Sequence, residues 1–268
     1  MKASLVTKSG EFKGEIELPN QFTEPVRDDL ISRAVLSLQS KRRTPYGAYE
    51  MAGKRQSTYN SKRRRKYRGT YGIGISRIPR KIMSRSGGHF NRVAAFAPGT
   101  VGGRRAHAPK SMKIWFERIN TKENRKAIRS AMSASVTKEI VLARGHKVPD
   151  KYPIVVSGDF EEISKTLDLV NVLEKMKLSE ELERSSVKKV RAGIGKRRNR
   201  KYQKRKGILF VVSKNCKLME ACKNISGVDV VNVLSLNAEH LAPGSVPGRL
   251  TLYTQGVIEK LKKDNLYM

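Results

Sequence analysis

Apolar residues recur at helical spacing in five parts of the chain, and each part predicts an amphipathic helix. Residues 28–40 place five apolar side chains on one face, and Asp28 and Asp29 stand where the helix dipole is positive. A longer helix is predicted from Thr121, whose hydroxyl can cap it, to about Ala143. Two shorter helices are predicted through residues 218–222 and over 254–263. The fifth is expected to open with Asp159, Glu161 and Glu162 and to bury Ile163, Leu167, Val170 and Leu173.

Short runs of β-branched and other apolar residues lie between these helices and predict buried strands. Three of them cover residues 153–157, 207–212 and 228–233, and a fourth is expected at 249–253. Strands that alternate with helices imply right-handed crossovers and a parallel sheet covered on both faces. The predicted fold class is therefore α/β, a three-layer α/β/α sandwich around a mostly parallel sheet, with a long extended basic loop inserted.

The charge of the chain is concentrated in two segments. The 268 residues carry a formal net charge of +32. Residues 41–113 contain twenty basic residues and one acid, Glu50, and residues 188–206 contain eleven basic residues and no acid. Together they hold +30 of the total, so the rest of the chain is nearly neutral. A charge of this size disfavours compaction unless a polyanion neutralises it.

Neither basic segment has the pattern of a packed domain. Residues 41–113 are dense in Gly, Ser, Pro, Arg and Lys, and show no sustained helical period or strict alternation. Such a segment cannot offset its own ordering entropy, so we expect it to be disordered alone and to fold on a polyanion. We predict a globular α/β domain from residues 1–40 and 114–268, a loop at 41–113, and a second basic segment at 188–206 within the domain.

The residues of the first segment favour RNA as the polyanion. Aromatic residues stand between its arginines, and tyrosine rings and guanidinium planes stack on unpaired bases while Arg also binds phosphates. Glycines let the backbone approach RNA closely. The run Lys62–Lys66 could alternatively be a nuclear import signal or a solvated charge run. The interleaved aromatic residues are Tyr46, Tyr49, Tyr59, Tyr67, Tyr71 and Phe90.

A search for enzyme chemistry in the sequence finds no catalytic or cofactor motif. The pairs Gly72/Gly74 and Gly193/Gly195 neither follow a predicted strand nor open a helix, so we interpret them as flexible positions. The four histidines and two cysteines match no metal-binding spacing. Asp159, Glu161 and Glu162 are interpreted as surface charges at a helix N-terminus. No metal, cofactor, membrane span or signal peptide is predicted, and the chain is expected inside the cell.

Two runs of sequence then resemble a known family, the universal large-subunit ribosomal protein four. The run GTYGIGISRIPR (69–80) and the glycine-rich element GGRRAHAPK (102–110), which leads to Trp115, are similar to its signature. The helix at 120–136 and the run NAEHLAPGSVPGRLTLYT (237–254) resemble later family motifs. The archaeal branch is favoured, because eukaryotic members carry a long basic extension that is absent after Met268. Eukaryotic members also have a Trp-Gly-Thr-Gly-Arg-like sequence where this chain has Tyr71–Ile75.

The resemblance implies a structural role in the large ribosomal subunit. Family members thread a long loop through ribosomal RNA (rRNA), and its tip helps to form the peptide exit tunnel opposite large-subunit protein twenty-two. The implied partners are thus rRNA, neighbouring ribosomal proteins and the nascent polypeptide, in the cytoplasm. The tip corresponds to Arg68, Tyr71, Gly72, Ile73, Gly74, Ile75 and Arg77. In segment 41–113 the expected rRNA-binding residues are Arg42, Arg43, Lys54, Arg55, Lys62, Arg63, Arg64, Arg65, Lys66, Arg80, Lys81, Arg85, Arg92, Arg104, Arg105 and Lys110. In segment 188–206 they are Lys188, Lys189, Arg191, Lys196, Arg197, Arg198, Arg200, Lys201, Lys204 and Arg205.

Two other functions are weighed against this one. An rRNA-acting enzyme would need a glycine loop at a strand end or a cluster of carboxylates and histidines, and the sequence offers neither. A chromosome-compacting DNA-binding protein is the other alternative, since phosphate recognition by charge does not by itself distinguish RNA from DNA.

Overall fold

The computed structural model describes residues 1–66 and 69–268 and divides the chain into two compact units. The first unit consists of Met1–Arg42 together with Phe116–Met268, and the second is Arg43–Trp115. Within the described residues, the helices are too short or too polar to cross a membrane. The predicted tip residue Arg68 and the aromatic residue Tyr67 lie outside the described residues.

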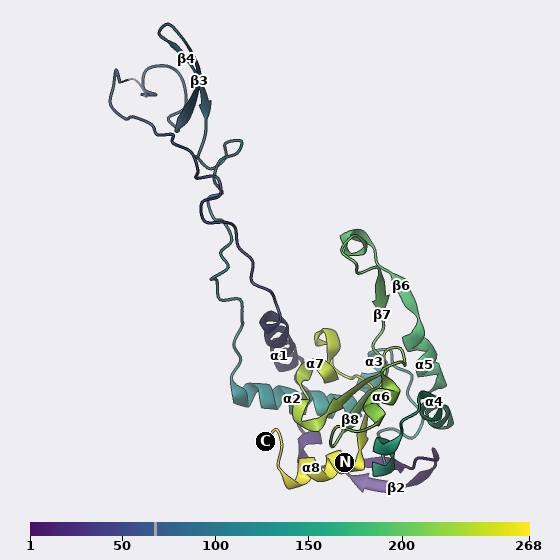
Figure 1. Cartoon of the computed structure of the whole chain (residues 1–268). Coiled ribbons are helices and arrows are strands. Elements are labelled where there is room, and N and C mark those ends of the chain that lie inside the picture. Colours follow the sequence, from purple (N-terminus) through teal and green to yellow (C-terminus); the bar gives the residue numbers. More distant parts are fainter. Residues whose placement is uncertain (67–68) are drawn as a thin grey trace. The chain divides into compact units, whose positions relative to one another are not determined.

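A six-stranded sheet in the order β2-β1-β5-β10-β8-β9 forms the centre of the first unit. Only β2 is antiparallel, and the other neighbouring pairs are parallel. The α/β part of the fold-class prediction is confirmed: a mostly parallel sheet lies between two layers of helices (Figure 1). The strands are β1 (Lys2–Val6), β2 (Phe12–Glu17), β5 (Ile154–Val156), β8 (Leu209–Val212), β9 (Asp229–Asn232) and β10 (Thr251–Thr254).

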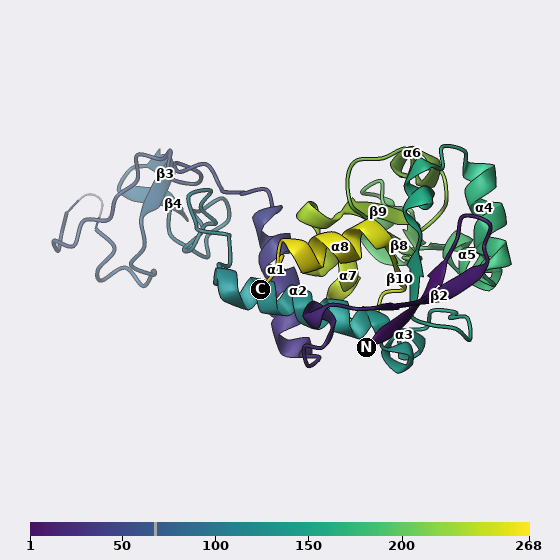
Figure 2. The ribbon, with the colours of Figure 1, turned by 90° about the horizontal axis from the view of Figure 1, so that it is seen from below.

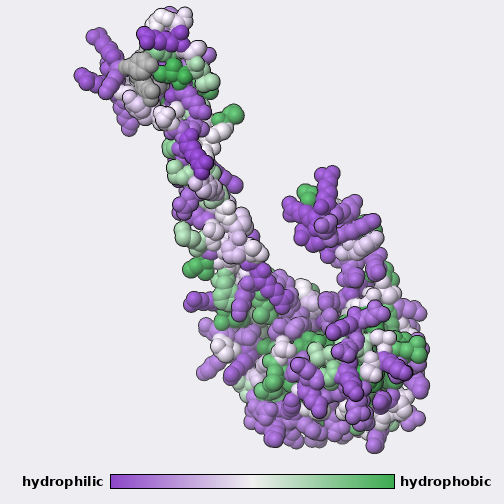
Figure 3. All heavy atoms as spheres, viewed as in Figure 1, coloured by the Kyte–Doolittle hydropathy of each residue, from purple (hydrophilic) through white to green (hydrophobic). Residues whose placement is uncertain are grey.

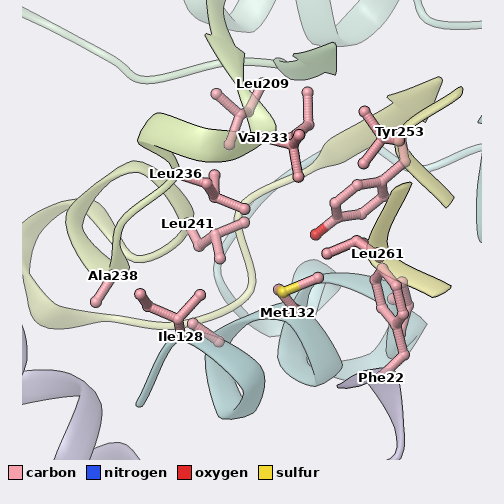
Figure 4. Packing of buried hydrophobic residues seen from close by; sticks show 14 of the residues in the cluster. Phe22, Ile128, Met132, Leu209, Val233, Leu236, Ala238, Leu241, Tyr253 and Leu261 are labelled. Carbon is pink, nitrogen blue, oxygen red and sulfur yellow. The ribbon is translucent and has the colours of Figure 1, made fainter. Parts of the chain in front are cut away.

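Alternating side chains of the central strands point to opposite faces of the sheet and build two separate cores. On one face, Leu209, Val211 and Tyr253 pack against Phe22 and Met132 (Figure 4). Figure 2 shows α1, α2 and α8 on one side of the sheet and α4 and α5 on the other. The first layer contains α1 (Asp28–Lys41), α2 (Thr121–Val136), α7 (Ala238–Leu241) and α8 (Gln255–Lys263). The second contains α3 (Lys138–Ala143), α4 (Thr166–Lys175), α5 (Ser179–Ser186) and α6 (Leu218–Cys222).

The long helix predicted from Thr121 to Ala143 is two helices. Thr137 is extended (φ −85°, ψ 109°) and separates α2 from α3. Its hydroxyl donates to the carbonyl of Ser133 at 3.0 Å, a local bond that competes with the helix ladder. Thr121 is the first helical residue rather than the cap, and the preceding Asn120 makes no side-chain capping bond.

The predicted start of the next helix, at the acidic residues Asp159, Glu161 and Glu162, was also wrong. A short 3₁₀ turn, Gly158–Glu162, precedes it, and α4 begins only at Thr166. This shifts the buried face, so that Leu167 is 70% exposed whereas Leu169 is buried. Strands β1 and β2 were not predicted, because β2 is an edge strand whose residues are mostly exposed.

Both basic segments contain a hairpin that the sequence pattern did not predict. In the second unit β3 (Arg80–Ser86) pairs with β4 (His89–Ala94) across a turn at Gly87 and Gly88. In the first unit β6 (Lys188–Val190) pairs with β7 (Tyr202–Lys204). The four strands are largely exposed, so their residues carry no alternation of apolar and polar types.

Candidate nucleic-acid interface

A cluster of aromatic and basic side chains joins the two ends of the second unit. The rings of Tyr46 and Trp115 lie 4.8 Å apart between centroids. The guanidinium of Arg43 lies 4.6 Å from the Trp115 ring and the ammonium of Lys113 lies 5.3 Å from it. Cations over the face of an indole are attracted by its quadrupole, so these contacts hold the two chain ends together.

Beyond this cluster the outgoing and returning chains run in close contact. The Ala48 amide donates to the carbonyl of Pro109 at 2.9 Å. A Cβ atom on Gly53, whose φ is +70°, would lie 2.6 Å from the Cα atom of Arg104. Only glycine fits such an approach at this backbone angle. The contact places two expected RNA-binding residues, Lys54 and Arg55, near Arg104 on the opposite chain.

Besides Arg43, further arginines of this unit stack on aromatic rings of their own chain, Arg92 on Phe90 at 5.3 Å among them. The distances from guanidinium carbon to ring centroid are 4.7 Å for Arg55 and Tyr49, 5.5 Å for Arg77 and Tyr71, 5.5 Å for Arg85 and Phe90, and 5.7 Å for Arg104 and Phe96. A guanidinium held by its face keeps its N–H groups, which lie in its plane, available for phosphate oxygens. The rings therefore orient the arginines without neutralising them.

Some of the predicted phosphate-binding arginines already donate hydrogen bonds within the unit, Arg85 to the carbonyl of Gly87 at 3.1 Å among them. Arg80 donates to the hydroxyl of Ser76 at 2.7 Å, and Arg92 donates to the carbonyl of Gly69 at 2.5 Å. Both residues belong to the β3–β4 hairpin, and both are half-buried. Their hydrogen bonds connect the hairpin to the predicted tip, so these arginines also fix the local fold.

In the described part of the unit, most of the remaining basic residues are exposed, although Arg104 is half-buried, and most of the described tip residues are exposed. Lys62–Lys66 form an exposed run, while Lys81, Arg105 and Lys110 are exposed at separate positions. At the tip, Tyr71 is 38% and Ile73 is 51% exposed. Gly72 and Gly74 have positive φ angles of 78° and 67° with open space around them.

The second basic segment has no core of its own. All its residues from Lys188 to Lys206 are exposed except the half-buried Gly195, and the hairpin is almost wholly hydrophilic in Figure 3. Its backbone is ordered by strand pairing and by a bond from the Arg200 amide to the Gly195 carbonyl at 2.9 Å. Its ten predicted RNA-binding side chains therefore remain available to a partner.

Lys206 and Arg249 are two basic residues that the site prediction left out. Arg249 is 1% exposed and donates to Asp229 at 2.5 Å and to the carbonyl of Gly207 at 2.9 Å. Lys206 donates to the same carboxylate at 2.8 Å. Burial opposes ionisation of Asp229, but the hydrogen bonds from Lys206 and Arg249 outweigh it and lower its pKa. Lys206 is the last residue of the basic segment 188–206, and this position in the sequence could have identified it as a site residue.

Glu161 was interpreted as a surface charge, and that interpretation is wrong. Its side chain is buried and accepts hydrogen bonds from the Ser213 amide at 2.9 Å and the Thr254 hydroxyl at 2.7 Å. It thereby connects the ends of β8 and β10 to the turn after β5. Asp159 and Glu162 are exposed. Across the part of the chain that is described, no group of three His, Cys, Asp or Glu residues could hold a metal ion.

Comparison with known proteins gives full-length matches to one family. A family model described as "Ribosomal protein L4/L1 family" matches residues 16–264. The chain is 46% identical over 268 residues to "Large ribosomal subunit protein uL4" of Nanoarchaeum equitans, covering 100% of both chains. It is 42% identical over 262 residues to the protein of the same name from Archaeoglobus fulgidus, covering 97% of this chain and 98% of the relative.

Proposed function

We propose, since the chain belongs to the ribosomal protein L4/L1 family, that its two basic segments bind the rRNA of the large ribosomal subunit. The resemblance read from the sequence is confirmed, and the similar proteins reported above are archaeal. The chain is a structural protein of the large subunit in the cytoplasmic ribosome, and it is not an enzyme.

The observation that carries the proposal is that the two segments are mostly exposed and almost wholly positive in charge. They hold 31 basic residues against one acid, and most of these side chains in the described part of the chain are exposed. An RNA backbone supplies the counter-charge, and release of its condensed cations favours binding. The arginines that stack on their own tyrosine and phenylalanine rings present N–H groups in fixed directions, which suits phosphate recognition.

We propose a separate role for the tip, residues Arg68–Arg77. Tyr71 and Ile73 expose apolar surface there, and the two left-handed glycines allow a tight turn of the backbone. Such a turn adds little to RNA affinity but can form part of a wall. In this proposal the tip lines the peptide exit tunnel near large-subunit protein twenty-two and contacts the nascent polypeptide.

Deleting the tip and replacing arginines elsewhere in segment 41–113 should have different effects. Removing residues 68–75 should leave subunits that assemble with a wider tunnel constriction. Replacing Arg104 and Arg105 with alanine should impair assembly, because each charge-assisted contact contributes roughly 1.5–3 kcal/mol. Sucrose-gradient profiles and a density map of the tip-deleted subunit would measure both effects. If the tip deletion abolished assembly while the double variant assembled normally, the two roles would be reversed.

A further inference from the structure

A hollow lies beside Arg42, where the first unit gives way to the second, and beside Lys206, where the second basic segment ends. Arg42 caps the end of α1 immediately before the second unit begins, and Lys206 is the last residue of the basic hairpin segment. Both residues line one cavity of about 360 Å³. Asp229, His240, Pro243 and Arg249 are among its other walls. The cavity therefore adjoins the roots of both segments that are proposed to hold RNA.

The cavity lies at the amino ends of three adjacent parallel strands. Asp229 is the first residue of β9, and Lys206 and Arg249 precede β8 and β10 by a few residues. Ligands of open α/β sheets usually bind at the opposite edge, outside the carboxyl ends of the strands. In this chain the hollow at the carboxyl edge contains Glu161, and both of its oxygens already accept hydrogen bonds from Ser213. Beside the cavity at the amino edge, hydrogen-bonding capacity remains unused.

That capacity is at His240. Among the side chains in the described part of the chain, its Nδ1 atom is one of a few buried atoms without a hydrogen-bond partner. A buried polar atom without a partner costs about 1–3 kcal/mol. Burial and the nearby charge of Arg249 lower the pKa of His240, so the imidazole is neutral at pH 7. A neutral ring can hydrogen-bond a base edge, stack on a base face, or do both.

The cations at this cavity are held by carboxylates that an RNA phosphate could replace. The guanidinium of Arg42 lies 2.6 Å from Glu239, and its side chain is 61% exposed. The ammonium of Lys206 lies 2.8 Å from Asp229, and its side chain is 54% exposed. Both cations can turn toward a phosphate, and Glu239, whose side chain is 20% exposed, then loses its ion pair with Arg42. Arg249 remains to neutralise Asp229 when Lys206 turns away.

We propose that this cavity binds one unstacked nucleotide of the rRNA, with its phosphate on Arg42 and Lys206 and its base against His240 and Pro243. Single-stranded RNA is recognised in this way, by bases that leave the stack and contact side chains with flat or apolar faces. The volume of the cavity is at the small end of the range for ligand sites, which suits one nucleotide. The inference rests on the proposed function, since it names a specific contact within the RNA interface.

Hydroxyl-radical footprinting of the unaltered full-length chain tests the proposal directly. The chain would be oxidised alone, with a naked transcript of archaeal large-subunit rRNA, and in assembled subunits. We expect the naked transcript to protect His240 and Pro243. Absence of protection in a complex that does form would overturn the proposal. Protection that appears only in assembled subunits would also overturn it as stated, because the rRNA transcript alone would then not occupy the cavity.

Two variants with a matched control extend the test. His240→Ala should weaken rRNA affinity about 10-fold without changing its dependence on salt, because a lost base contact releases no counterion. Lys206→Ala should make the salt dependence shallower, whereas Lys214→Ala, at the opposite edge of the sheet, should change neither quantity. Unaltered affinity of a folded His240→Ala chain would contradict the proposal. Failure of the unaltered chain to bind rRNA would instead contradict the proposed function.

Discussion

Arg249 is a buried cation whose hydrogen bonds hold together the start of three strands. Its guanidinium contacts the Asp229 carboxylate and the carbonyls of Gly207 and His240. The run Gly248-Arg249-Leu250 belongs to the closing motif that resembled the family. The arginine thus has a structural reason to be there in addition to any contact with RNA.

Replacing Arg249 with methionine should destabilise the first unit strongly. The change leaves buried carbonyls without a donor and Asp229 without its buried partner, and breaking a buried ion pair costs about 3–5 kcal/mol. Urea unfolding would measure the loss. Arg33→Met is the matched control, because Arg33 is 58% exposed and pairs with Glu123 at 3.3 Å. A loss for Arg249→Met no larger than that of the control would show that the network is not stabilising.

A second buried network makes the fold sensitive to acid. Glu181 accepts hydrogen bonds from His146 at 2.7 Å, from Arg184 at 2.8 Å and from the Lys147 amide at 3.0 Å. Burial opposes ionisation, but these bonds outweigh it and lower the pKa of Glu181 from 4.5 to about 2. Burial also lowers the pKa of His146, so this ring favours the neutral form.

Both shifts have the same sign for stability. A carboxylate with a lowered folded pKa stabilises the fold above its unfolded pKa, and the contribution is lost as pH falls from 4.5 toward about 2. The His146 imidazole lowers the stability of the fold further below pH 6.5, because the unfolded chain takes up this proton at a higher pH than the folded chain does. Glu181→Gln should therefore be less stable than the unaltered chain at pH 7, by about 3 kcal/mol, with the difference shrinking toward pH 3.

Chemical denaturation at several pH values would test this prediction. The control is Glu180→Gln, because Glu180 is largely exposed and its nearest cation, Lys147, is 3.8 Å away. Its curve should follow that of the unaltered chain. A constant gap between the Glu181→Gln and unaltered curves from pH 7 to pH 3 would contradict the pKa assignment.

At the residue level the sequence predicted well where the exposed positive charge lies, but it predicted poorly which charged residues are buried. The cations of both segments could be counted directly, because the two segments together contain a single acid. Glu161 and His146 could not be interpreted in this way. Their partners, Ser213 and Glu181, are 52 and 35 residues away, so only the folded sheet brings them together.

At the level of elements, prediction succeeded where a segment buries apolar side chains. Strands β5, β8 and β10 are buried at every position and were predicted from their β-branched runs. Strands β3, β4, β6 and β7 lie in the basic segments and bury little, so no alternation indicates them. Their order comes from backbone pairing and stacked arginines, which leave no periodic signal in the sequence.

The contact between the outgoing and returning chains should depend on Gly53. Gly53→Ala adds a Cβ atom 2.6 Å from the Arg104 Cα atom at a φ of +70°, so the two chains must separate locally. We expect faster proteolysis of residues 43–115 and about 10-fold weaker rRNA binding, the equivalent of about 1.4 kcal/mol. Gly88→Ala is the control, since a Cβ atom there meets nothing within 4 Å. Equal proteolysis of the two variants would contradict the close contact.

At the level of the whole molecule, the chain combines an α/β fold that is nearly neutral outside residues 188–206 with two segments that carry almost all the charge. Fold and function are therefore separable in the sequence: the apolar pattern predicts the sheet, and the basic runs predict the partner. What the pattern could not predict is the cavity at Arg42 and Lys206. It depends on two segment roots, more than 160 residues apart, that meet at one edge of the sheet.

The salt dependence of rRNA binding tests the central claim most directly, because phosphate contacts release counterions. If about 8 basic residues each neutralise a phosphate, a plot of log affinity against log salt concentration should have a slope of roughly −5 to −7. Deleting residues 188–206 should make the slope shallower, whereas deleting the tip, residues 68–75, should change it much less. A slope near zero for the intact chain, or an unchanged slope after removal of 188–206, would contradict the account.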